Sequence, residues 1–339
     1  MRNLVASLVL FGSLSPGFTQ PVVINMGTLA PEGSPWHQIV LQMGEQWRVI
    51  SAGKVKLRIY PGGVLGDEQD MVKKMRIGQL QAVSVTDVAL REIEPAVYSL
   101  QVPMMLQSYE ELDYVRDRIT PGLEKMIEAK GYVVLNWGDV GWVHFFTKAP
   151  ASRLSDIRKM KLFTWAGDNE ELEMWKGAGF RPVPLAATDI LMGLQTGLID
   201  TFDTAPLAAL SNQWFGLVTY MIAVKWAPLT GATVVSKSTW ERIPAAERAE
   251  MLKAARLAGE RMRGEVRKSG DEAVAAMQKR GLKVIEPDAA ALADWRREAE
   301  SIYPRLRGKS VPAEMFDEVQ RLREEYRMRG GTGPKSGQS

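Results

Sequence analysis

The sequence predicts an α/β protein made of two similarly built lobes, and three observations support this fold class. A strand over 22–26, a helix over 36–50 and a strand over 54–60 follow one another, an order typical of a parallel sheet with helices on its faces. A helix–glycine–strand unit occurs twice, once in each half of the chain. The chain has 339 residues, of which 45% are apolar, and this is enough for two α/β cores.

The repeated unit predicts a cleft that both lobes share. Its first copy lies in 65–85, with Gly78 between helix and strand, and its second lies in 184–210, with Gly197 in that place. Glycine suits the left-handed position that ends a helix. Because ligands of open α/β sheets bind beyond the carboxyl ends of strands, polar residues at those ends are candidates for the cleft. In the second copy these are Asp200, Asp203 and Thr204.

The N-terminal segment predicts export. Residues 1–20 begin with a basic residue, continue with an apolar run too short to span a bilayer, and end in small residues, as a secretory signal peptide does. The chain contains no cysteine, which excludes a lipidated cysteine, disulfides and thiolate metal sites. We therefore expect a soluble periplasmic protein without a lipid anchor.

Composition argues against an enzyme and against nucleic-acid binding. The net charge is only +3, and the basic residues of the C-terminal helices alternate with acidic ones, so no uncompensated basic stripe exists. The only histidines are His37 and His144, and neither belongs to an HExxH or nucleophile motif. We expect no catalytic residues, no metal and no cofactor.

Four segments together resemble the extracytoplasmic solute-binding proteins of TRAP transporters, the DctP-type family. They are PGGVLGDEQDMVKKMRIGQLQA (61–82), DIRKMKLFTWAGD (156–168), ATDILMGLQTGLIDTFDTAP (187–206) and VVSKSTWERIPAAERAEMLKAA (234–255), and the resemblance covers roughly 22–328. It implies a bilobal periplasmic-binding-protein-like fold, with two α/β lobes joined by hinge strands and long helices. It also implies closure on a small ligand and delivery to membrane subunits that use an ion gradient.

The chain divides accordingly into predicted parts. After the signal peptide (1–20), the first lobe covers 21–145 with a return segment near 230–265, and the second lobe covers 146–229. The aromatic stretch 138–147 makes the crossing between them. The C-terminal helices of 266–328 are expected to pack across both lobes, and the Gly/Ser-rich tail 329–339 to be disordered.

One departure from the family pattern concerns the ligand. The resemblance implies an arginine in the strand after the crossing, where its guanidinium would grip a ligand carboxylate with two hydrogen bonds. Phe163 occupies that position here, and Thr204 stands where an asparagine is usual. Arg91 or Lys161 could replace the lost charge. We therefore expect a ligand that is less anionic and more apolar or aromatic than usual, with a carboxylate as the alternative.

The predicted ligand site combines aromatic rings with acidic and hydroxyl groups near loop and strand ends. It consists of Trp36, Glu68, Asp87, Trp142, Phe163, Trp165, Asp168, Asp203, Thr204 and Trp214. The alternative for each tryptophan is packing in a core or hinge, and the alternative for each acid is capping a helix.

The predicted function is that of a periplasmic solute receptor that closes on its ligand and delivers it to TRAP membrane subunits. The alternative is an exported ligand-sensing or scaffold subunit with the same fold, which would act on a protein partner through its exposed charged helices.

Overall fold

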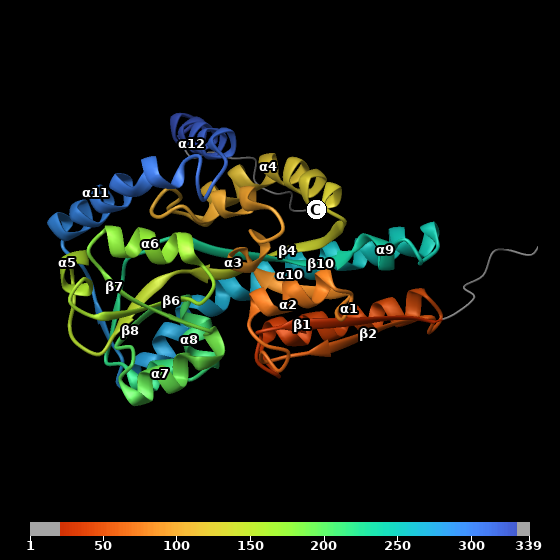
Figure 1. Cartoon of the computed structure of the whole chain (residues 1–339), viewed down its shortest axis with the longest axis horizontal. Helices are drawn as coiled ribbons and strands as arrows, with labels where there is room; N and C mark the ends of the chain where they lie inside the picture. Colours follow the sequence, from red (N-terminus) through yellow and green to blue (C-terminus); the bar gives the residue numbers. More distant parts are fainter. Residues whose placement is uncertain (1–20, 331–339) are drawn as a thin grey trace, which may run out of the picture.

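Two sheets, each covered by helices, form the molecule (Figure 1). The computed structural model describes residues 21–330, so the predicted signal peptide and residues 331–339 of the predicted tail lie outside the described residues. We call the part around the first sheet the first lobe and the part around the second sheet the second lobe. The predicted α/β bilobal fold class is confirmed.

The first sheet has the strand order β2-β1-β3-β10-β4. Its strands are β1 (Val22–Thr28), β2 (Val55–Tyr60), β3 (Ala82–Thr86), β4 (Tyr132–Trp142) and β10 (Pro228–Ser236). β1 pairs in parallel with β2 and β3, as the alternation of strands and helices predicts. The exception is β10, which is antiparallel to both of its neighbours.

The second sheet has the order β11-β9-β5-β8-β6-β7. Its strands are β5 (His144–Thr147), β6 (Lys161–Trp165), β7 (Arg181–Leu185), β8 (Thr201–Thr204), β9 (Tyr220–Ile222) and β11 (Lys283–Ile285). Here β5 is the strand antiparallel to its neighbours β8 and β9. In each sheet, the reversed strand is therefore the one by which the chain enters from the other lobe.

The two crossings run side by side and are hydrogen-bonded to each other. The first leads from β4 through Val143 to β5, and the second leads from β9 to β10. Val143 N–H donates to Ala227 O at 2.8 Å, and Trp226 N–H donates to Val143 O at 2.9 Å. A short two-stranded connection thus links the lobes.

Helices cover both sheets and are numbered in the order in which they occur along the chain (Figure 1). They are α1 (Pro35–Ile50), α2 (Glu68–Arg76), α3 (Asp87–Leu90), α4 (Tyr109–Ala129), α5 (Leu154–Ile157), α6 (Asn169–Gly177), α7 (Ile190–Thr196), α8 (Pro206–Ser211), α9 (Lys237–Trp240), α10 (Ala245–Gln278), α11 (Ala289–Leu306) and α12 (Ala313–Met328). Gly78 (φ 76°) follows α2 and Gly197 (φ 71°) follows α7, so both copies of the repeated unit have the left-handed glycine that their sequences predict.

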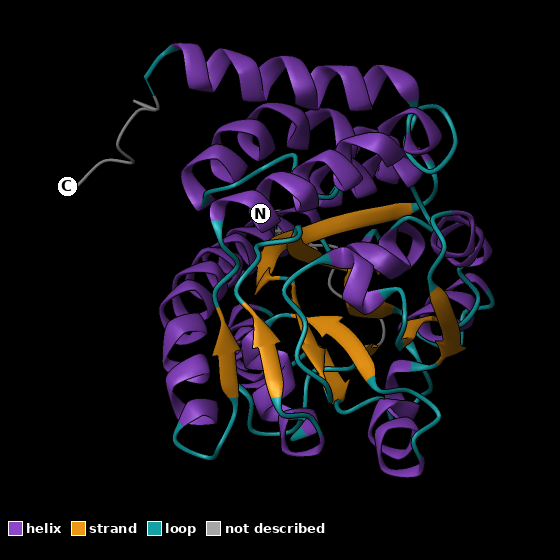
Figure 2. Cartoon of the chain, turned by 90° about the vertical axis from the view of Figure 1, so that its left-hand side faces the viewer, coloured by secondary structure: helices purple, strands orange, loops and turns teal. Residues whose placement is uncertain are grey.

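The 34-residue helix α10 contacts both lobes. Met251 and Met262 pack in the core beneath α1, whereas Met277 packs with Phe146 and Phe202 of the second sheet. At Gly259, a Cβ atom would lie 2.7 Å from Trp137 O, so glycine lets the helix approach β4 closely. In Figure 2, long helices lie along one side of the strands and above them.

From the sequence we expect an interruption near Ser269-Gly270 in the long helical pattern of 244–280, and separate helices over 108–118 and 121–130. Both expectations are wrong. The helix α10 continues through the partly buried Ser269 and Gly270, because its packing against both lobes stabilises it, and Pro121 lies inside the single helix α4. Buried residues before and after it, Val115 and Leu123 among them, pack in one core and compensate for the backbone hydrogen bond that proline cannot make.

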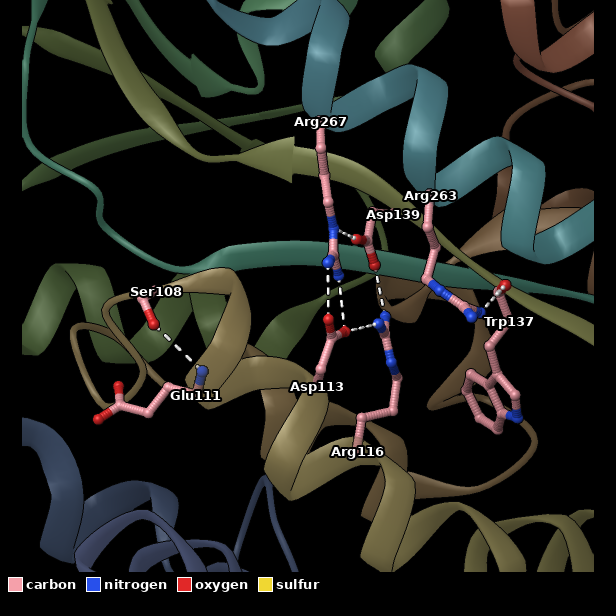
Figure 3. A network of polar contacts seen from close by, with 8 residues as sticks. All are labelled: Ser108, Glu111, Asp113, Arg116, Trp137, Asp139, Arg263 and Arg267. Atoms are coloured by element: carbon pink, nitrogen blue, oxygen red, sulfur yellow. Dashed lines mark hydrogen bonds and ion pairs between the residues drawn. The ribbon is translucent and has the colours of Figure 1, made fainter. Parts of the chain in front are cut away.

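A network of charged side chains fixes the crossing strand β4 to α4 and α10 (Figure 3). Asp139 on β4 is 1% exposed and accepts hydrogen bonds from Arg116 and, at 2.7 Å, from Arg267 Nε. Arg267 also makes a bidentate pair with Asp113 at 2.6 and 2.7 Å, and Arg116 contacts the same carboxylate. Arg263 of α10 donates to Trp137 O at 3.3 Å. Each buried charge therefore has partners of the opposite sign or polar partners.

We predict that Asp139→Asn lowers the free energy of unfolding by about 3–5 kcal/mol, because it removes the more deeply buried of the two carboxylates that Arg116 and Arg267 share. The matched control is Asp317→Asn, which removes the partner of Arg307 from a pair that is about half exposed. The control should cost no more than about 1 kcal/mol. Urea denaturation measures the free energy of unfolding of both variants. An equal decrease in the two would show that the Asp139 network contributes no more to stability than an exposed ion pair.

Candidate functional site

A cavity of about 130 Å³ lies between the lobes. The first lobe contributes the segment after β1, the start of α2 and the end of β3. The second lobe contributes the ends of β6 and β8, α8 and Trp214. The cavity thus lies at the carboxyl ends of strands, where ligands of α/β sheets bind.

Seven of the ten predicted site residues line this cavity. They are Trp36, Glu68, Phe163, Trp165, Asp203, Thr204 and Trp214. That these residues bind a ligand stays a prediction. The structure brings them together because the two repeated units supply Glu68 and Thr204 from opposite lobes.

Glu68 is held by the end of the neighbouring strand. It begins α2, is 2% exposed, and accepts hydrogen bonds from Thr86 N at 3.0 and 3.1 Å and from Thr86 Oγ1 at 2.6 Å. Burial raises the pKa of Glu68 to about 8, because the loss of water outweighs these hydrogen bonds. The carboxyl group is therefore fixed in place while its charge is disfavoured.

Asp203 also has a strongly shifted pKa. Burial, with a smaller contribution from the charge of Glu171, raises the pKa of Asp203 to about 8, and a hydrogen bond with its own backbone opposes this only weakly. Among the described residues, no side chain donates a hydrogen bond to its carboxylate in the structure. Asp203 is thus an acid at the cavity wall, and no lysine, arginine or histidine within residues 21–330 lines the cavity with it.

Aromatic rings form much of the remaining wall. The Phe163 and Trp165 rings are 5.7 Å apart and nearly edge-to-face, and Trp214 packs edge-on against Phe202 at the same distance. On the first lobe, Trp36 Nε1 donates to Ser84 Oγ at 2.8 Å, which fixes the indole plane. These rings are held by packing and hydrogen bonds, so the wall is preformed.

The other three predicted residues do not line the cavity. Asp87 is fully buried within the first lobe, where Thr230 Oγ1 donates to it, and burial raises its pKa to about 7. Trp142, at the end of β4, packs on Tyr109 with ring centroids 5.5 Å apart. Asp168 caps α6 by accepting from Glu171 N at 2.9 Å, which is the helix-cap alternative stated for the acids.

The two basic residues considered as replacements for the missing arginine are engaged elsewhere. Arg91 forms an ion pair with Asp168, with side-chain exposures of 12% and 2%, and its guanidinium lies 4.6 Å from the Tyr98 ring centroid. Lys161 lies at the start of β6 and donates to Gly197 O. Neither residue lines the cavity.

Several contacts hold the lobes together around the cavity. Arg91 comes from the first lobe and Asp168 from the second, so their ion pair joins the lobes. Asp67 Oδ2 accepts a hydrogen bond from Ala187 N at 2.9 Å. Gly167 approaches Gln69 so closely that a Cβ atom there would lie 2.1 Å from Gln69 Oε1. The structure therefore shows the two lobes in direct contact around the cavity.

Sequence reasoning missed several wall residues, among them Thr86, Ala187 and Asn212. The signal for Thr86 was available, because it ends the strand of the first repeated unit just as Thr204 ends that of the second. The histidines have structural partners: His37 Nδ1 accepts from Gly33 N at 3.0 Å, and His144 contacts Ile222 O at 3.2 Å. Burial lowers the pKa of His144 to about 4, so it stays neutral.

The family model for bacterial extracellular solute-binding proteins, family 7 (DctP), matches residues 26–309. This chain belongs to that family. A solute-binding protein of Roseobacter denitrificans is 27% identical to the DctP-type chain over 286 residues, covering 82% of this chain and 85% of that protein. Family members are substrate-binding receptors of transporters and not enzymes.

Solved structures show the same fold. A sugar acid binding protein of Advenella mimigardefordensis, in complex with galactonate, superposes with a TM-score of 0.84 at 19% identity and covers 90% of this chain and 99% of its own. A TRAP periplasmic solute binding protein of Sulfurospirillum deleyianum with bound succinate has a TM-score of 0.81 at 19% identity, with coverages of 89% and 99%. The family is periplasmic. Within residues 21–330 of this DctP-type chain, no helix is long and apolar enough to cross a bilayer.

We predict that Arg91→Ala shifts the ligand-free DctP-type protein towards an open form, because it removes one partner of a nearly buried interlobe ion pair. Small-angle X-ray scattering should show a larger radius of gyration than for the unmodified protein. Arg48→Ala is the control, since Arg48 pairs with Glu45 on the exposed face of α1. A radius unchanged in both variants would show that this ion pair does not hold the lobes together.

Proposed function

We propose that this protein is an exported periplasmic receptor of a TRAP transporter that closes its lobes over a small organic ligand and delivers it to membrane subunits. The cavity between two sheets that are joined by a hydrogen-bonded pair of crossings carries this proposal. Such a connection permits rotation of the lobes, and a ligand bound to both lobes favours the closed state by its greater affinity for it.

The family match favours this role over the alternative of a sensor or scaffold subunit. Family 7 proteins are solute receptors, and two solved neighbours hold galactonate and succinate. The proposed export is supported by the signal-peptide pattern of residues 1–20.

The proposed ligand differs from these acids in being more apolar or aromatic. Phe163 stands where the family resemblance places a carboxylate-binding arginine, and its ring contributes to the cavity wall. Trp165 and Trp214 add further ring surface from the same lobe. A preformed wall of this kind gains affinity mainly from the burial of apolar ligand surface.

The small molecules bound by the receptor can be found by a thermal-shift screen of one-ring aromatic compounds and simple carboxylates. We predict that at least one aromatic compound raises the melting temperature and that Trp165→Ala weakens its binding about tenfold or more, since burial of a ring is worth about 1.5–3 kcal/mol. Trp165→Phe should retain most of the affinity because it keeps a ring. Stabilisation by dicarboxylates alone would contradict the proposed ligand class, and scattering that shows no closure with any ligand would contradict the receptor function.

A further inference from the structure

The charges in the cavity wall all have one sign. Among the described residues that line the cavity, Glu68 and Asp203 are the only ionisable ones, and both are acids. A carboxylate ligand would enter a space that offers it two acids and no lysine, arginine or histidine. Because burial in a low dielectric strengthens repulsion between like charges, such a wall disfavours anions when its acids are ionised.

The two basic residues considered as replacements for the missing arginine cannot easily turn towards the ligand. Arg91 would have to leave Asp168, which is 2% exposed, and so leave a buried carboxylate without its partner. Lys161 lies at the opposite end of β6 from Trp165. The fold therefore leaves only acidic ionisable groups in the described cavity wall, and a change of side-chain rotamer at Arg91 or Lys161 would not easily alter this.

The two acids differ in how well the protein satisfies them. Both oxygens of Glu68 already accept hydrogen bonds from Thr86. The carboxylate of Asp203 has no side-chain donor among the described residues, although it lies at the end of β8, next to the lining residue Thr204. Asp203 is thus the group whose hydrogen-bonding capacity remains for a ligand.

Aromatic rings complete the chemistry that an organic cation needs. Trp faces attract ammonium groups through the ring quadrupole, and groups of rings recognise protonated and quaternary amines. Trp36, Trp165 and Trp214 lie in the same wall as Asp203. The cavity of about 130 Å³ is close to the roughly 150 Å³ that holds a benzene molecule in an engineered protein cavity, which limits the ligand to about one ring.

We propose that the cleft binds an organic cation of about one ring in size, a protonated or quaternary amine, with Asp203 as its counter-ion and Trp36, Trp165 and Trp214 around it. This rests on the proposed receptor function and names its ligand class. The family resemblance implies a positively charged arginine on the protein and a carboxylate on the ligand. Here the charges are exchanged: the carboxylate of Asp203 is on the protein, and the positive charge is on the ligand.

The proposal has a consequence for pH. Asp203 must be ionised to pair with a cation, whereas burial and Glu171 hold its pKa at about 8 in the ligand-free protein. The other titratable groups around it are Glu68, whose pKa burial also raises to about 8, and Tyr98, whose pKa burial raises well above its usual range. Binding therefore releases protons from acids, and affinity for a cation of fixed charge should rise from pH 6 to pH 8 and then level off. Binding of an anion by protonated acids would show the opposite slope.

The test compares three ligands of one ring that differ in charge: benzylamine, benzyl alcohol and benzoate. Isothermal titration at pH 8 should give a dissociation constant for benzylamine at least tenfold lower than for the other two. Asp203→Asn should weaken benzylamine binding roughly 10- to 100-fold, the size of a lost hydrogen bond to a charged group, and leave benzyl alcohol binding within about twofold. Glu45→Gln on exposed α1 is the control for net charge and should change neither. Tetramethylammonium, whose charge is fixed, reports the pH slope.

The outcomes separate this inference from the receptor function. Benzoate or benzyl alcohol binding as tightly as benzylamine, or an Asp203→Asn variant that binds benzylamine normally, would overturn the cationic ligand and leave the receptor intact. If none of the three binds and scattering shows no closure with any compound of the wider screen, both the inference and the receptor function are overturned.

Discussion

Two carboxyl groups are buried in a cavity that no basic residue of the described chain lines, and the proposed ligand class depends on this constraint. Burial raises the pKa values of Glu68 and Asp203 to about 8, and no basic residue of the described part of the chain lines the cavity with them. Their burial therefore favours the neutral forms of both groups. A ligand with a positive charge and apolar surface would relieve this cost, whereas a carboxylate would add to it.

A small number of polar contacts around that cavity join the lobes. The Arg91–Asp168 pair and the Asp67–Ala187 hydrogen bond join the lobes directly. On the other side, the Asp139 network ties the crossing strand β4 to α4 and α10, so the hinge is braced at its first-lobe end. The paired crossings near Val143 and the long helix α10 connect the lobes, and the strand ends that line the cavity belong to the two sheets.

The sequence allowed the fold class to be predicted because local signals and the global arrangement agree. Gly78 and Gly197 both end helices with positive φ, and the strands after them end at the cavity. Local signals failed where tertiary packing overrides them, as at Pro121 inside α4 and at Ser269-Gly270 inside α10.

Residues of the cavity wall could be predicted where strand ends form the wall, as for Asp203 and Thr204. Asp87 and Asp168 could not be separated from the wall residues, since their partners Thr230 and Arg91 are distant in sequence and the sequence does not show which charges pair.

The most direct test is to identify the small molecule that the purified, folded protein carries by native mass spectrometry followed by denaturation and analysis of the released compound. The account predicts a compound of about one ring in size that contains an amine and no carboxylate. One molecule should be bound per protein molecule, and the Asp203→Asn variant should carry none. Release of a sugar acid or a dicarboxylate such as succinate would contradict it.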